Sequence, residues 1–193
     1  MKLLTQQDVL SQEEYERQRE AFRSRIIALK QRRRISVGPL ITLIFENRET
    51  LRFQVQEMIR VERIVEPAKV QDELDVYNAL LPSPQELSAT LLIEITEEAR
   101  IQEWLDAFMG LDRGQTVAIE AGGERAFGEF EGGHSHETKI SAVHFVRFRP
   151  TAAMKEAFAD LRQPVTISVN HGSYHEEVPV PGSMREEWLA DLQ

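Results

Sequence analysis

Four of the five histidines lie in two short polar segments of this 193-residue chain, and imidazole is a common metal ligand. His134 and His136 stand two residues apart in "GGHSHETK", where an extended backbone would turn both rings to the same side. His171 and His175 enclose residues 172–174 of a predicted hairpin turn, whose two arms lie close together. Two such turns at one end of a sheet would provide the three or four ligands that zinc, manganese or iron needs.

This histidine pattern permits a divalent metal site but does not require one. Histidines in polar loops are mostly solvated, and H-x-H without a helical H-x-x-x-H partner is a weak signal. The chain has no cysteine, so any metal would need imidazole and carboxylate ligands. The sequence establishes no cofactor, and a metal-dependent enzyme or metal-binding protein stays one hypothesis.

The fifth histidine, His144, falls in a strand predicted over residues 139–148 that is apolar on both faces. A lone imidazole in such a strand is usually a neutral, hydrogen-bonded core residue, and we interpret His144 in this way. Arg147 and Arg149 lie on the other face of the strand. We expect each to pair with a carboxylate or to reach solvent.

A second candidate site is basic and lies at the end of the first predicted helix. It comprises Arg23, Arg25, Lys30, Arg32, Arg33 and Arg34. These side chains could bind RNA or DNA phosphates, but the net charge of −9 repels such ligands and the stretch lacks aromatic stacking partners. The pattern therefore favours a solvated or partner-binding helix over nucleic-acid binding.

That helix is predicted over residues 11–34. Ser11 and Glu14 form an S-x-x-E capping box, and neither Gly nor Pro follows before residue 35. Its apolar stripe is narrow and consists of Tyr15, Phe22, Ile26 and Leu29. Such an amphipathic helix would pack on the domain or on a partner, so we expect a protein partner or a homo-oligomer.

The remaining pattern predicts one α+β domain over residues 1–193, with a mainly antiparallel sheet built from β-hairpins and three to four further helices. Hairpins are predicted for residues 40–45 with 50–56, 116–119 with 126–131, and 165–169 with 174–180. Another strand begins at residue 88, and further helices are predicted near residues 71–80, 96–109, 151–161 and 183–192, the last with Ser183 and Glu186 as a capping box.

The N-terminal 20 residues lack the apolar stretch of about 7 to 15 residues that a signal peptide needs. No other stretch is long and apolar enough to span a bilayer. We therefore expect a cytoplasmic protein that does not associate with a membrane.

Three blocks carry a resemblance to a known family: "ISVGPLITLIFENRETLRFQVQEMIRVERI", "LPSPQELSATLLIEI" and "KISAVHFVRF". They resemble an uncharacterised bacterial family catalogued as domain of unknown function number 3501, over nearly the full chain. The resemblance implies no activity and no catalytic residue. Members are often encoded beside rubrerythrin-like and iron–sulfur reductase proteins, which suggests a role near peroxide or redox metabolism.

No nucleophile elbow, P-loop, dinucleotide fingerprint or H-E-x-x-H motif occurs in the sequence, so whether the protein is an enzyme stays open. The sequence favours a non-catalytic accessory or partner-binding protein in bacterial redox, peroxide or metal physiology. The alternatives are the metal site at the histidine turns and nucleic-acid binding by the arginine-rich helix.

Overall fold

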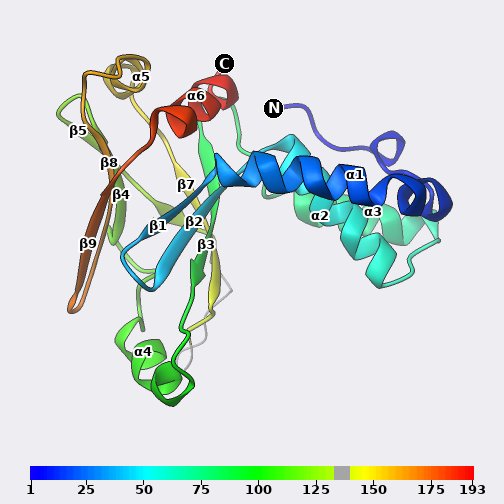
Figure 1. Cartoon of the computed structure of the whole chain (residues 1–193), viewed down its shortest axis with the longest axis horizontal. Coiled ribbons are helices and arrows are strands. Elements are labelled where there is room, and N and C mark those ends of the chain that lie inside the picture. Colours follow the sequence, from blue (N-terminus) through cyan, green and yellow to red (C-terminus); the bar gives the residue numbers. More distant parts are fainter. Residues whose placement is uncertain (133–139) are drawn as a thin grey trace.

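The computed structural model describes residues 1–132 and 140–193, which form two antiparallel β-sheets and six α-helices (Figure 1). Three of these helices make an arm that extends to one side of the sheets, and we call this part the helical arm (α1–α3). The sheets and the other helices make up the β body. The α+β prediction with mainly antiparallel strands is confirmed. In the described residues, no helix combines the length and apolarity needed to cross a membrane.

The first sheet has five strands in the order β1-β2-β3-β7-β6. Their bounds are Arg34–Val37 (β1), Ile41–Glu46 (β2), Leu87–Ile93 (β3), Val143–Phe148 (β7) and Glu129–Phe130 (β6). One face of this sheet enters the main core, because Leu43, Phe45, Leu91 and Val146 are all completely buried. Alternate residues of the strands point to the opposite face.

The second sheet has four strands in the order β5-β4-β8-β9. Their bounds are Glu124–Phe127 (β5), Val117–Ala121 (β4), Val165–His171 (β8) and Tyr174–Pro179 (β9). Its buried residues, such as Ile119 and Ile167, share one core cluster with those of the first sheet. The Tyr174 hydroxyl donates to the Val37 carbonyl at 2.5 Å, which joins β9 to β1 across the two sheets.

The predicted hairpin arm over residues 126–131 divides between the two sheets. Its first part belongs to β5, while Glu129 and Phe130 pair with β7 in the other sheet. Gly128 lies at the crossing point, and a Cβ atom there would stand 2.5 Å from a Val146 methyl carbon. Only glycine allows the backbone to approach β7 this closely.

Two short helices, α5 (Ala152–Ala159) and α6 (Gly182–Asp191), lie near one end of the sheets (Figure 1). Trp188 of α6 is fully buried, with its ring centroid 4.6 Å from Phe45 and 5.2 Å from Phe158. The short helix α4 (Ile101–Ala107) lies at the opposite end, after the 3₁₀ turn η2 (Glu98–Arg100).

The helical arm consists of α1 (Gln12–Gln31), α2 (Arg48–Val61) and α3 (Pro67–Asn78), preceded by the 3₁₀ turn η1 (Gln6–Asp8). Helix α2 packs against α1 and against α3. The arm has its own buried apolar clusters, one between α1 and α2 and one that includes α2 and α3. The predicted capping box of Ser11 and Glu14 is present at the start of α1.

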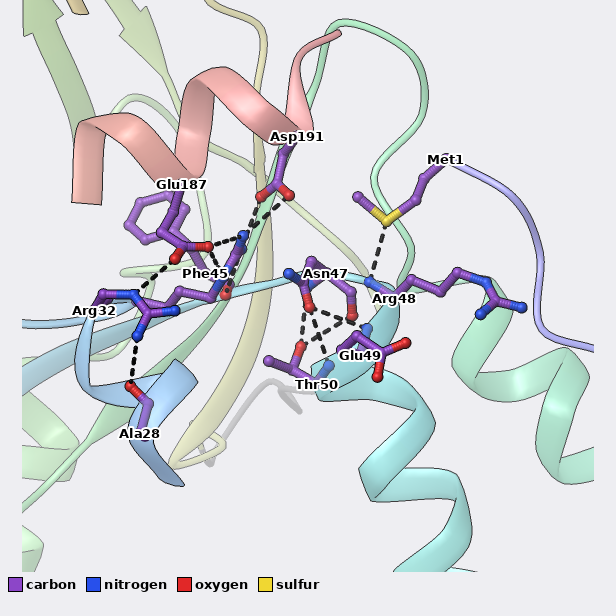
Figure 2. Close-up of polar contacts among 11 residues, drawn as sticks. Met1, Ala28, Arg32, Phe45, Asn47, Arg48, Glu49, Thr50, Glu187 and Asp191 are labelled. Atoms are coloured by element: carbon purple, nitrogen blue, oxygen red, sulfur yellow. Dashed lines mark hydrogen bonds and ion pairs between the residues drawn. The ribbon is translucent and has the colours of Figure 1, made fainter. Parts of the chain in front are cut away.

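The prediction of a β-strand over residues 50–56 is wrong, because this segment belongs to α2. Asn47 caps the helix by accepting hydrogen bonds from the Glu49 and Thr50 amides (Figure 2). Leu51 and Val55 face the cluster shared with α3, whereas Phe53 packs on α1. A helix that packs between two others has apolar residues on two sides. In residues 50–56 this spacing gives the same alternation of apolar and polar residues as a strand.

Three smaller predictions about helices also need correction. In the described residues five α-helices follow α1, where three to four were expected, partly because α2 was predicted as a strand. The first helix ends at Gln31, and Arg34 already begins β1. Helix α6 begins after Pro181 without the predicted capping box of Ser183 and Glu186; the Pro181 carbonyl instead accepts from the Met184 and Arg185 amides.

The contact between α1 and α2 depends on Glu57. Its carboxylate accepts two hydrogen bonds from Arg19, at 2.8 and 2.9 Å, and one from the Tyr15 hydroxyl at 2.5 Å. These bonds, above all those from Arg19, lower the pKa of Glu57 from 4.5 to about 2. The ionised form of Glu57 therefore stabilises the packing of α1.

We predict that Glu57 makes the protein sensitive to acid. Because its folded-state pKa lies below the ordinary value, its stabilising effect is present above pH 4.5 and is lost as the pH falls toward 2. Thermal unfolding of the wild type and of Glu57→Gln, measured between pH 7 and pH 2, should give a smaller decline for the variant below pH 4.5. Parallel curves would contradict this role, and Glu13→Gln, at an exposed position of α1, is the matched control.

Candidate functional site

The two histidines of the β8–β9 hairpin point to opposite faces of the sheet. His171 pairs with Tyr174, and His175 pairs with Asn170, so alternation along the strands separates the two rings. His171 Nε2 lies 3.0 Å from the Met109 carbonyl oxygen, and His175 Nδ1 lies 3.1 Å from Asn170 Oδ1. Proximity across the turn therefore does not bring these imidazoles together.

His134 and His136 lie outside the described residues, so the meeting of the two histidine turns stays a prediction. Within residues 1–132 and 140–193, no group of three or more His, Cys, Asp or Glu side chains is arranged to hold a metal ion. Zinc, manganese or iron binding likewise stays a prediction.

His144 is a core residue, as predicted: it is completely buried, and its Nε2 lies 2.8 Å from the Ser141 carbonyl oxygen. On the other face of β7, Arg147 and Arg149 both pair with Glu86, whose side chain is 8% exposed. Arg147 also binds Glu131, and Arg149 binds Glu129. The expected carboxylate pairing of both arginines is confirmed.

A hollow of about 370 Å³ lies beside these ion pairs, between the start of the chain and the segment that follows α3. Its two guanidinium groups are bound by carboxylates of the same chain, and Arg147 also donates to the Leu81 and Ala79 carbonyls. Side chains engaged in this way stabilise a corner of the fold. They do not form a ready anion site.

Three of the six residues in the predicted basic set form ion pairs with carboxylates of the same chain. Arg32 binds Glu187 (Figure 2). Arg33 binds the same Glu187 and also Asp191. Arg34 forms an ion pair with Glu94 at 2.8 Å. These ion pairs therefore attach the end of α1 and strand β1 to α6 and to the segment after β3.

Arg33 is the most buried member of the set, with 1% of its side chain exposed. Its guanidinium binds two carboxylates of α6 at 2.9 and 2.7 Å and also donates to the Phe45 carbonyl at 3.4 Å. Burial raises the pKa of Asp191 although Arg33 lies beside it. The cluster joins the end of α1, strand β2 and helix α6, and we call it the Arg33 junction.

The rest of the basic set lies on α1. Arg23 and Arg25 are exposed, and Lys30 is half-buried. The Arg25 guanidinium lies over the Phe22 ring, 4.8 Å from its centroid. The surface available to phosphates is thus smaller than the sequence suggested, and nucleic-acid binding stays a prediction for these three residues.

The arm contains a site that the sequence analysis did not foresee. The N-terminal segment is fastened across α2 and α3 by amide side chains, each of which bonds both polar groups of one backbone residue. Gln56 binds the amide and carbonyl of Leu10, and Asn78 binds those of Leu4. Arg52 also donates to the carbonyl of Asp8.

This fastening creates a groove of about 370 Å³ between the N-terminal segment, the end of α2 and the start of α3. Ile59 contributes to its lining and is nearly buried, while Val65 at the edge is 75% exposed. The full lining, mostly apolar, is Gln6, Val9, Leu10, Ser11, Gln12, Ile59, Ile64, Val65, Pro67 and Val70. We call this site the arm groove.

One signal in the sequence could have pointed to the arm groove. The stretch "RIVEPAKV" places Ile64, Val65 and Val70 around a proline, in the connecting segment between the predicted elements at residues 50–56 and 71–80. Apolar residues in a connector must either be buried or remain exposed for another purpose. The role of Gln56 and Asn78 could not be predicted, because their partners lie 46 and 74 residues away.

The fold and the groove together define an α+β protein in which two antiparallel sheets support a projecting three-helix arm. Residues 3–192 match the model of a family described as protein of unknown function (DUF3501), and the chain belongs to this family. A crystal structure of a novel protein of unknown function from Burkholderia pseudomallei has the same fold, with a TM-score of 0.90, 31% sequence identity and 100% coverage of both chains. Among curated proteins, none matches the chain significantly.

We predict that Arg33→Ala destabilises the protein by about 3–5 kcal/mol, because it leaves two carboxylates at the Arg33 junction without their buried cation. Arg32→Ala removes a pair to the same Glu187, but the Arg32 side chain is 49% exposed, so we expect a loss of at most about 1 kcal/mol. Urea denaturation of both variants measures the difference. Equal losses would contradict the role given to burial.

The metal hypothesis predicts that protein purified without a histidine tag contains stoichiometric zinc, manganese or iron, and that His134→Ala and His171→Ala each lose it. Elemental analysis of the three proteins provides the measurement. His175→Ala should keep its metal, because that ring lies on the other face of the hairpin from His171. Untagged wild-type protein without metal would remove the hypothesis.

Proposed function

We propose that this protein is a non-catalytic partner-binding protein and that the arm groove is its docking site. The observation that supports this proposal is an apolar groove at the surface of the helical arm, whose edge residue Val65 is 75% exposed. Burying such a side chain in a partner removes apolar surface from water, which favours association. A partner in redox, peroxide or metal physiology stays part of the proposal.

Exposed apolar residues also occur on the arm outside the groove, but the groove itself carries the conclusion. Val61, at the end of α2, is 60% exposed, and Val76 of α3 is 61% exposed. Isolated exposed apolar residues are ordinary, but an apolar groove with an exposed edge is typical of an interaction site. One buried cluster lies between α1 and α2, and a second one around α2 and α3 also packs against Phe145 of β7, so the groove stands on a packed support.

The groove is also suited to docking because its walls are fixed. The N-terminal wall is held by hydrogen bonds of 2.8 and 3.1 Å between Gln56 and Leu10. On the other side, Pro67 occupies the first turn of α3, where its ring restricts the backbone. A preformed groove loses little conformational entropy on binding, which favours affinity.

We predict that a photo-crosslinking amino acid at position 65, in the full chain in its native cells, forms a discrete adduct with a partner. The same amino acid at position 161 should form none, because Leu161 is similarly exposed, at 66%, but belongs to the β body. Denaturing electrophoresis and mass spectrometry of the adducts provide the measurement. An adduct between two copies of the chain would identify a homo-oligomer as the partner.

The adduct at position 65 should also disappear when a second substitution, Val70→Lys, places a charge in the lining of the groove. Adducts of equal yield at both positions, or an adduct that survives Val70→Lys, would contradict docking in the groove. Circular dichroism of the substituted proteins checks that the helices remain folded.

A further inference from the structure

The charges around the arm groove indicate what kind of segment it binds. Residues 3–16, which supply the N-terminal wall, contain four acidic residues and no Lys or Arg. Residues 62–75, which supply the opposite wall, contain five acidic residues and two basic ones. An apolar groove between two acidic segments attracts a segment that is apolar on one side and positively charged on the other.

Three acidic residues stand next to the groove lining in the sequence. Glu13 follows Gln12, Glu62 precedes Ile64 by two residues, and Glu66 stands between Val65 and Pro67; all three acids are exposed. Two exposed bases, Arg63 and Lys69, also neighbour lining residues, so the acids outnumber the bases there by three to two. In the described part of the chain, neither Glu13 nor Glu62 forms an ion pair, and Glu66 pairs only with the exposed Lys69. These carboxylates can therefore bind cations of a partner at little cost.

We infer that the occupant of the arm groove is a basic amphipathic helix of another protein, whose apolar side chains enter the groove while its Lys and Arg side chains face Glu13, Glu62 and Glu66. This inference rests on the proposed docking function. Apolar residues at positions i, i+3 or i+4, and i+7 form one face of a helix, and this spacing is typical of helices that bind in grooves.

A second copy of the chain is a poorer occupant than another protein. The basic amphipathic segment of the chain is the latter half of α1, which contains Arg23, Arg25 and Lys30. Two large apolar residues of that half, Phe22 and Ile26, are buried against α2 and are 5% and 1% exposed, whereas Ile27 is 45% exposed. Ile27 alone does not form an apolar helix face, and Phe22 and Ile26 cannot enter the groove of another copy without detaching α1 from its own arm.

The test uses three fluorescent 14-residue peptides with the same leucine spacing and with lysine, glutamine or glutamate at the other positions. Each is titrated against the full-length protein by fluorescence anisotropy at low and high salt. We expect the leucine–lysine peptide to bind at least about tenfold more tightly than the leucine–glutamine peptide, and the leucine–glutamate peptide to bind least. High salt should reduce the difference.

Substituted proteins show where on the surface the leucine–lysine peptide binds. Val65→Lys should weaken binding of the leucine–lysine peptide about tenfold or more, whereas Leu161→Lys, with the same charge change at an exposed position of the β body, should change it less than about twofold. The double variant Glu13→Lys and Glu62→Lys should weaken the lysine peptide and leave the glutamine peptide nearly unchanged. All four substituted positions are exposed, so the variants should fold.

The outcomes separate the two proposals. If the lysine and glutamine peptides bind equally and both depend on Val65, the groove docks a partner but the inference about charge is overturned. If Leu161→Lys weakens binding as much as Val65→Lys does, peptide binding depends only on the net charge of the protein, and the inference is again overturned. If no peptide binding depends on Val65, the inference and the proposed docking site are both overturned.

Discussion

The structure depends on the Arg33 junction, where one buried cation joins three elements that are distant in sequence. Its guanidinium binds Glu187 and Asp191, which are four residues apart on α6 and so lie on one side of that helix. Trp188 stands between them and packs on Phe45. The ion pairs and the apolar contact thus hold α6 against β2 together. Because Arg33 stands two residues after the end of α1, the same junction also sets where the arm leaves the β body.

The geometry of the arm follows from this attachment. Strand β2 ends at Glu46, and Asn47 caps α2 immediately, so the strand and the helix are joined without a flexible linker. Helix α2 then contacts α1 through Phe53 and Glu57, and α3 through Leu51 and Val55. With α2 fixed at its start and packed on two sides, the groove at its far end has rigid walls.

Much of the fold could be predicted from the sequence, because hairpins and capped helices depend on local signals. The β8–β9 hairpin and the capping box of Ser11 are examples. The errors occurred where tertiary contacts decide the structure. Residues 50–56 alternate like a strand because the central helix buries two sides, and the segment after β5 changes sheets at Gly128 because of its close contact with β7.

The candidate sites show the same limit more clearly, because charge and residue type do not reveal partners within the chain. The basic run at residues 32–34 resembled a phosphate-binding surface, yet its carboxylate partners belong to α6 and to the segment after β3. Those acids lie 60 to 158 residues away. The acidic excess around the arm groove is different, since Glu13 and Glu62 have no ion pair in the described residues. Exposed charges without an internal partner, beside an apolar groove, are free to bind a second molecule, whereas the paired arginines are already used by the fold.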